Sequence, residues 1–253
     1  RTMAFDIKKL DWSKEIFEVA GIDVHKMSKT VPTGTDAGVI TAEAAEKTGL
    51  APSTHIVSIS HDQVSAAIGA GAFDSSVAVD GAGTVECVTP IYDSIPNIDA
   101  MYDGYFSIVP YVIPGKYVAY AFSYTGGALI QWCVDNLAKD EKRAAADRDL
   151  SVNEYLEKKY ATERGEENPS NLLILPHFAG AATPYMDTGS KGAILGLTTD
   201  TTVADIYRGC MEGVVYEMLV NTSALKKSGC KFRKLNATGG GARSGEWMQM
   251  KAD

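Results

Sequence analysis

The chain has 253 residues, of which 45% are hydrophobic and 22% are charged, so it is long enough for one large globular domain or two smaller ones. The net charge of −8 argues against a protein that binds along nucleic acid or an anionic membrane, although backbone N–H groups can still hold phosphate. The sequence shows neither an apolar run long enough to span a bilayer nor a secretory signal peptide, so we expect a cytoplasmic protein.

Cysteine and histidine spacing predicts no metal centre. The four cysteines occur in no C-x-x-C pair and at no zinc-ligand spacing from a histidine: Cys87, Cys133, Cys210 and Cys230. We interpret them as reduced, mostly buried thiols. Three histidines likewise form no recognisable ligand set: His25, His55 and His177.

The first third of the chain predicts short helices and one strand. The apolar spacing in LDWSKEIFEVAGI indicates a helix that ends near Gly21, and TAEAAEKTGL indicates a second helix between a capping Thr41 and Gly49. HIVSIS alternates like a strand, and HDQVSAAIGAGAF follows as a helix with a face of small residues. Asp62 is therefore expected at a strand-to-helix junction.

Residues 77–122 predict β-structure. VAVDGAGTVECVTPIY indicates a hairpin around DGAGTVE, and YFSIVPYVIPGKYVAYAF indicates further strands that turn at the prolines. SYTGGALIQWCVDNLAKDEK then predicts a helix that opens at a glycine pair. The charge-rich residues 139–170 are interpreted as a solvated helical face without a chemical role.

The last third predicts a strand, a loop, a long helix and a final strand–turn–helix unit. LLILPHF is expected as a buried strand, with His177 in a structural role, and AGAATPYMDTGSKGAILGL as a loop. The long helix TVADIYRGCMEGVVYEMLVNTSALKKSG is expected to stop at Gly229, and KLNATGGGARSGEWMQMKAD reads as strand, glycine turn and helix. This alternation of strands and helices predicts an α/β fold.

Three glycine turns are the strongest chemical signal: DGAGT, TGGALIQ and TGGGARS. Glycine lets a ligand approach the backbone, and the N–H groups of a following helix favour negative charge. Each turn has an ordinary explanation, since Asp-Gly alone is a common hairpin signal. No G-x-x-x-x-G-K-[ST] loop is present, and GGGARSG only approximates the dinucleotide pattern because Ser244 occupies the third glycine position. Three such turns in one chain favour a nucleotide.

Asp62 is the best candidate for a reactive carboxylate. Taken alone, it is explained more simply as an N-cap that accepts N–H bonds from the first turn of its helix. The alternative is a general base at the carboxyl end of a strand, where α/β folds place their sites. His61 and Gln63 are adjacent and could hydrogen-bond a polar ligand or lie on the surface.

In their order along the chain, these stretches resemble the FGGY carbohydrate kinase family, which includes xylulokinases and glycerol kinases. RTMAFDIKKLDWS is similar to the segment near the end of the family's first domain, and SHDQVSAAIGAGAF to the segment that carries its catalytic aspartate. DGAGTVE resembles the phosphate loop that opens the second domain, and TGGALIQW, LPHFAGAATPYMD and NATGGGARSGEWMQMKAD continue in the family's order. The resemblance implies an actin-like, ribonuclease-H-like fold in which two α/β domains enclose a nucleotide cleft. It places residues 1–79 in the first domain and residues 80–253 in the second.

The resemblance also implies ATP-dependent phosphorylation of a sugar or polyol, with ATP and Mg²⁺ as cofactors. Asp62 would be the general base, and His61 and Gln63 would contact the sugar. Eight residues would contact ATP: Gly83, Thr84, Gly127, Gln131, Gly239, Gly240, Gly241 and Ser244. No nucleic-acid or membrane partner is expected, whereas a homodimer is an expectation from the family.

Two departures keep other functions open. The family's first phosphate loop and most of its first domain are absent, and the chain begins at Arg1 and stops inside a predicted helix, so we expect a fragment. A related fold could instead serve an actin-like or chaperone-like ATPase regulated by a protein partner. A non-catalytic nucleotide-binding module is the third alternative. ADP release that depends on a sugar would distinguish the kinase from both.

Overall fold

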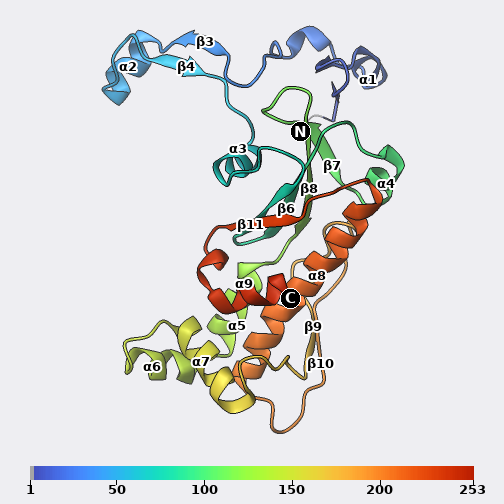
Figure 1. The fold of residues 1–253 in the computed structure, drawn as a ribbon. Helices are drawn as coiled ribbons and strands as arrows, with labels where there is room; N and C mark the ends of the chain where they lie inside the picture. Colours follow the sequence, from blue (N-terminus) through green and yellow to red (C-terminus); the bar gives the residue numbers. More distant parts are fainter. Residues whose placement is uncertain (1–2) are drawn as a thin grey trace.

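The computed structural model describes residues 3–253 and is built around a mixed five-stranded sheet (Figure 1). The strand order is β11-β5-β6-β8-β7, in which β11 runs parallel to β5 and the other neighbours are antiparallel. The strands are β5 (Val77–Ala82), β6 (Glu86–Tyr92), β7 (Ser107–Pro110), β8 (Tyr117–Ser123) and β11 (Lys234–Thr238).

Both faces of the sheet are covered, which explains why every residue of β6 is buried. The helix α3 (Asp62–Gly69) packs Val64 and Ala67 against one face, where Val79 points. The long helix α8 (Val203–Lys227) packs against the other face, where Ala78 points. Because side chains alternate along a strand, the apolar run of β5 supplies both cores at once.

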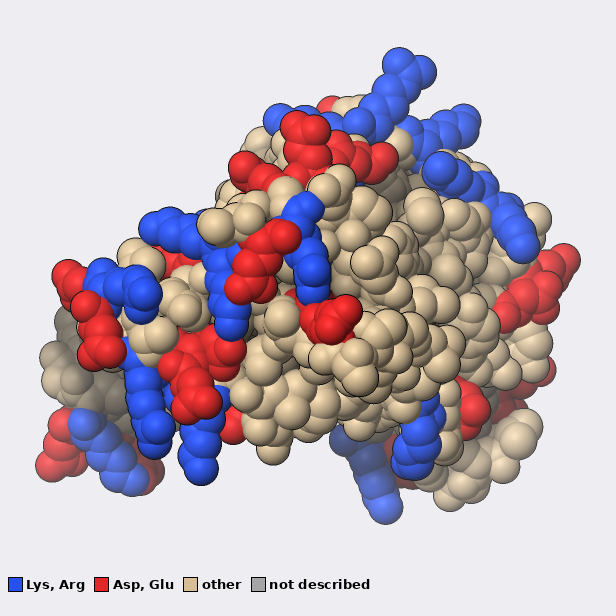
Figure 2. Space-filling model, turned by 90° about the horizontal axis from the view of Figure 1, so that it is seen from below, with Lys and Arg blue, Asp and Glu red and all other residues tan. Residues whose placement is uncertain are grey.

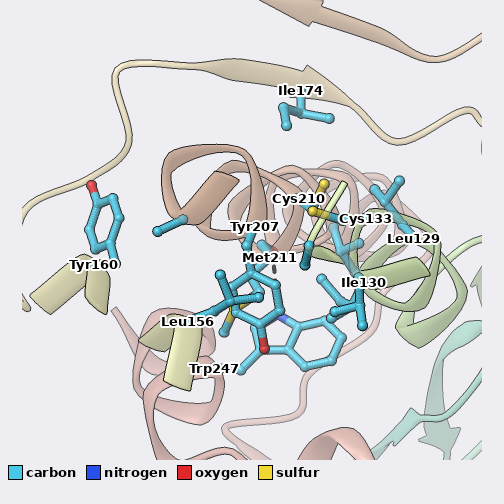
Figure 3. Packing of buried hydrophobic residues seen from close by; sticks show 14 of the residues in the cluster. Leu129, Ile130, Cys133, Leu156, Tyr160, Ile174, Tyr207, Cys210, Met211 and Trp247 are labelled. Atoms are coloured by element: carbon cyan, nitrogen blue, oxygen red, sulfur yellow. Dashed lines mark hydrogen bonds between the residues drawn. The ribbon is translucent and has the colours of Figure 1, made fainter. Parts of the chain in front are cut away.

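A third core joins the helices below the sheet. These helices are α5 (Gly127–Asn136), α7 (Val152–Arg164) and α9 (Gly245–Ala252), which pack with α8, while α6 (Lys139–Ala146) packs against α7 and α5. Figure 3 shows Leu156 of α7, Tyr207 and Met211 of α8, and Trp247 of α9 converging there. The Trp247 Nε1–H donates to the Met211 carbonyl at 3.3 Å, so the largest ring of this core is fixed in place. Residues 77–253 are called the sheet body below.

The chain before α3 forms an extended arm, drawn in blue at the top of Figure 1. Residues 3–60, called the N-terminal arm, hold the elements β1 (Phe5–Asp6), β2 (Asp11–Trp12), α1 (Lys14–Val19), a short 3-10 helix (Val24–Lys26), β3 (Asp36–Val39), α2 (Ala42–Thr48) and β4 (His55–Val57). All residues of β3 and β4 are exposed. The arm therefore has little core of its own.

Most of the local predictions are confirmed. Thr41 caps α2 through its side chain, and Gly49 ends it in the left-handed region at φ 74°. The hairpin forms around DGAGTVE, with Ala82 opposite Glu86 and a three-residue turn between them. The cysteines are free thiols, of which Cys230 alone is partly rather than fully buried.

Three predictions about the helical half are wrong in part. The helix expected to run on from TGGALIQ ends at Asn136, and α6 begins separately at Lys139. The strand β9 (Leu173–Leu175) is buried on one face alone: Ile174 is 2% exposed, whereas Leu173 and Leu175 are 55% and 40% exposed. Among the described residues it pairs with the single strand β10 (Ala193–Leu195). That partner strand lies in the segment expected to be a loop.

The remaining elements complete the surface. The short helix α4 (Ile98–Asp103) packs beside α8. His177 is buried, and its Nδ1 atom lies 2.8 Å from the Ser190 hydroxyl, in keeping with the predicted structural role. None of the helices within residues 3–253 is both long enough and apolar enough to cross a bilayer. Figure 2 shows acidic and basic side chains interspersed on the face seen from below.

Candidate active site

A cleft of about 1170 Å³ lies where the β5–β6 turn, α5, α7, α8 and the segment before α9 meet. Its walls include seven of the eight residues predicted to contact ATP: Gly83, Thr84, Gly127, Gln131, Gly240, Gly241 and Ser244. These residues are as much as 161 positions apart in the sequence. The fold therefore brings the three glycine turns of the sequence to one place.

The first two turns are joined by backbone hydrogen bonds. The N–H groups of Gly126 and Ala128 donate to the Thr84 carbonyl at 3.0 Å each, and the Gly127 N–H donates to the Gly83 carbonyl at 2.8 Å. The prediction that the N–H groups at the start of this helix point at a ligand is therefore wrong for these three residues. They are used to fix α5 against the hairpin.

The hairpin turn itself keeps donors for a ligand. The Gly83 N–H is shared between the carbonyls of Gly81 and Val85, at 3.0 and 3.1 Å. The N–H groups of Thr84 and Val85 have no acceptor within the described residues, and both residues are exposed. With the Thr84 hydroxyl, they form a small set of exposed donors suited to an anion.

The third turn packs against the end of β5. Gly239 has φ +91°, and a Cβ at this position would lie 2.6 Å from the Ala82 carbonyl oxygen. A Cβ at Gly241 would lie 2.7 Å from the Trp247 ring and 3.0 Å from the Ala82 Cβ. Gly240 has nothing within 4 Å of its Cβ position and lines the cleft. Gly239 is the one predicted ATP contact outside the cleft lining. Its lack of a side chain allows the backbone of the third turn to pack closely against the end of β5.

Ser244 connects this turn to α7, a segment to which sequence reasoning gave no chemical role. Its hydroxyl accepts the Trp247 N–H at 3.1 Å and donates to Glu157 Oε1 at 2.9 Å. Burial raises the pKa of Glu157, while hydrogen bonding to Ser244 opposes the shift. Glu154 and Glu157 line the cleft one helical turn apart, a spacing that could have revealed a common face within the charged run.

A buried ionic cluster lies next to the cleft and was also missed. Lys251 of α9 has its Nζ atom 2.7 Å from Asp80 Oδ2 and also bonds Glu86 Oε1, and all three side chains are at most 4% exposed. Burial, together with the hydrogen bond and charge of Asp80, raises the pKa of Glu86 to about 9. Because Asp80 and Glu86 flank the hairpin turn, the cluster ties that turn to α9.

The candidate base lies outside the cleft lining, on the helix that covers the hairpin strands. His61, not Asp62, is the N-cap residue of α3, and Asp62 begins the helix with its side chain 84% exposed. The N-cap explanation of Asp62 is therefore wrong, although its Oδ1 does accept the Gln63 N–H at 2.7 Å.

The neighbours of Asp62 point in different directions. His61 Nε2 lies 2.5 Å from Asp62 Oδ1, and its ring meets Tyr120 edge-on at 5.7 Å. Gln63 Oε1 reaches toward the hairpin, 3.5 Å from where a Gly81 Cβ would lie. The structure thus pairs His61 with the carboxylate and places Gln63 between α3 and the hairpin.

Comparison with known proteins identifies the family. Residues 82–253 match the C-terminal domain of the FGGY family of carbohydrate kinases, and residues 1–69 match its N-terminal domain. The chain belongs to the FGGY family of carbohydrate kinases.

Relatives of this FGGY chain include kinases for different substrates. A xylulose kinase of Lactococcus lactis subsp. lactis is 26% identical over 253 residues, covering 100% of the chain and 47% of that protein. A glycerol kinase of Carboxydothermus hydrogenoformans is 29% identical over 262 residues, again covering 100% of the chain and 47% of that protein. The chain therefore spans about half the length of the curated relatives it matches.

A solved structure supports the same assignment at the level of fold. A xylulose kinase from Brucella ovis superposes with a TM-score of 0.79 at 21% identity, covering 97% of this chain and 47% of that one. The α/β, actin-like fold predicted from the sequence is confirmed. The division of this FGGY chain at residues 79 and 80 stays a prediction.

Proposed function

We propose that the complete protein transfers the terminal phosphoryl group of ATP to a hydroxyl of a sugar or polyol. The observation that carries this proposal is the convergence of three glycine turns on one cleft of about 1170 Å³ in a chain of the FGGY family. The named substrates of the relatives, xylulose and glycerol, support the substrate class without choosing between them.

The nucleotide would bind along the cleft. Thr84 offers its N–H and hydroxyl to the phosphates, and Gly83 and Gly127 keep the approach free of side chains. A Cβ at Gly127 would lie 2.7 Å from the Gly83 carbonyl, so only glycine allows this contact between turn and helix. Gln131, Gly240, Gly241 and Ser244 line the part proposed to hold the nucleoside.

Magnesium is proposed to bind together with ATP. Within residues 3–253 no group of three His, Cys, Asp or Glu side chains gathers in a way that could hold a metal. Mg²⁺ in such enzymes is held largely by the substrate phosphates, whose charge it neutralises.

Asp62 is proposed to accept the proton of the attacking hydroxyl, which contributes about 10²- to 10⁴-fold to the rate. His61 Nε2 would fix the orientation of the carboxylate from 2.5 Å, while His61 and Gln63 are the proposed sugar contacts. Phosphoryl transfer depends on positioning and charge stabilisation more than on covalent chemistry, so one oriented carboxylate is a sufficient base.

The test is ADP release by the full-length gene product over a panel of ketoses, aldoses and polyols that includes xylulose and glycerol. Release that requires one of these compounds supports the kinase. ATP hydrolysis that ignores every sugar but responds to a protein partner would favour the regulated ATPase, and tight ATP binding without turnover would favour the non-catalytic module.

A further inference from the structure

We propose that Glu157 selects the nucleotide, by accepting a hydrogen bond from an N–H or O–H group on its nucleoside half. The donor would be the exocyclic amine of the base or a ribose hydroxyl. This inference rests on the proposed function, because it assumes that ATP occupies the cleft.

The charge distribution of the cleft orients the ligand. The carboxylate of Glu157 would repel phosphates, whereas the turn at Thr84 offers donors to them. The helix α5 runs from Gly127 at the hairpin to the cleft residue Asp135, about 12 Å further along at the usual rise per residue. The cleft thus has donors at the hairpin and three carboxylates along α5 and α7, while Arg243 of the third turn is the cation of the lining.

Of the three carboxylates in the lining, Glu157 is the partly buried one, whereas Asp135 and Glu154 are exposed. Asp135 accepts bonds from Lys142 at 2.8 Å and Gln131 at 2.9 Å, one at each oxygen. Glu154 closes the capping box of α7, bonding the N–H and the hydroxyl of Ser151. Glu157 uses Oε1 for the Ser244 hydroxyl and also lies within hydrogen-bonding reach of the buried Tyr207 hydroxyl. A carboxylate can accept about four hydrogen bonds in all, so Glu157 can still accept one from a ligand.

Glu157 is also held in place before any ligand arrives. The Ser244 hydroxyl accepts the Trp247 N–H, so its own proton is directed at Glu157. Trp247 is 4% exposed and anchored in the helical core shown in Figure 3. Such preorganisation lets an acceptor discriminate, because a ligand that lacks the donor leaves a partly buried carboxylate without its partner.

The experiment compares nucleotides in the complete protein. Values of kcat/KM are measured for ATP, 2′-deoxy-ATP, 3′-deoxy-ATP and purine riboside triphosphate, which lacks the amine. The wild-type protein is expected to use one of the analogues about 10-fold less well than ATP, or worse, as for the loss of a hydrogen bond to a charged group. In Glu157→Gln the ratio of kcat/KM for ATP to that for the disfavoured analogue should shrink to a few-fold. The corresponding ratios for the other analogues should stay unchanged.

Glu163→Gln is the matched control, since Glu163 is an exposed glutamate on the same helix outside the cleft lining. Two results overturn the inference. The first, measured on the wild-type protein alone, is an equal kcat/KM for ATP and every analogue. The second is a Glu157→Gln protein that loses activity equally with every nucleotide. Failure of the proposed function looks different, because then no nucleotide supports phosphorylation of any sugar in the wild-type protein.

Discussion

The sheet body and the N-terminal arm differ in how they bury their residues. In the sheet body, β6 is buried along its whole length between α3 and α8. In the arm, β3 and β4 bury none of their residues, and Phe17 packs edge-on against Trp12 at 6.0 Å. The arm therefore depends on caps, turns and a few aromatic contacts, whereas the body depends on continuous apolar packing.

The same chemical groups consequently have different tasks in the two regions. An aspartate and a histidine pair on the exposed surface of the arm, as Asp36 and His55 do at 2.7 Å. In the sheet body, Asp80 and Lys251 form an ion pair in which both side chains are almost completely buried. Asp62 lies at the boundary, exposed like the arm but on a helix that packs on the sheet. A short distance between two charged groups therefore does not show how much the pair stabilises the fold; the exposure of both side chains decides that.

The largest expected effect is on catalysis. Asp62→Asn should lower kcat for sugar phosphorylation by about 10²- to 10⁴-fold, because it removes the proposed base. Thermal unfolding should change little, since the side chain is 84% exposed. Asp36→Asn changes another aspartate beside a histidine and serves as the control, with kcat expected unchanged. Equal activity of the two variants would remove Asp62 from the mechanism.

The next effect is on stability and tests the contrast between buried and exposed ion pairs. Lys251→Met leaves Asp80 and Glu86 buried without their cation and should lower the free energy of unfolding by about 3–5 kcal/mol. Lys47→Met breaks the exposed pair with Glu43 in the arm and should cost about 0–1 kcal/mol. Urea denaturation measures both, and similar losses would show that burial does not separate the two pairs.

Local order could be predicted from the sequence, because its causes are local. Thr41 and Gly49 bound α2 through a cap and a left-handed turn, and the hairpin follows from alternation around glycine. The two-stranded pairing of β9 with β10 could not be predicted, since a three-residue strand inside a glycine-rich loop carries little periodicity. Such short strands form only because neighbouring segments place them side by side.

The candidate site was predictable in its glycines but not in its charges. Glycine residues predict turns directly from the sequence, because glycine adopts backbone conformations that other residues disfavour. The bond from Lys251 to Asp80 spans 171 positions, and that from Ser244 to Glu157 spans 87. Only the tertiary fold decides that these particular charges meet, so composition and spacing give no sign of them.

A smaller effect tests the contact between hairpin and helix. Gly127→Ala should lower the free energy of unfolding by about 1–3 kcal/mol, because the new methyl group would lie 2.7 Å from the Gly83 carbonyl. The KM for ATP should rise as the two walls separate. Gly69→Ala, at the end of α3 with open space around its Cβ position, should leave stability unchanged or raise it by up to about 1 kcal/mol. Equal effects at the two glycines would contradict the close packing.

The last prediction concerns pH and the same buried cluster. Glu86 has a pKa near 9 in the folded protein, raised by burial and by Asp80, against an ordinary value of 4.5. The folded state therefore holds a proton that the unfolded chain releases, so the stabilisation is complete below pH 4.5 and is lost as pH rises toward 9. Urea titrations should show a decline of at most about 1.4 kcal/mol per pH unit. Glu86→Gln cannot titrate and should flatten this slope, whereas Glu43→Gln in the exposed arm should keep it. Parallel slopes in wild type and Glu86→Gln would mean that Lys251 holds both carboxylates ionised.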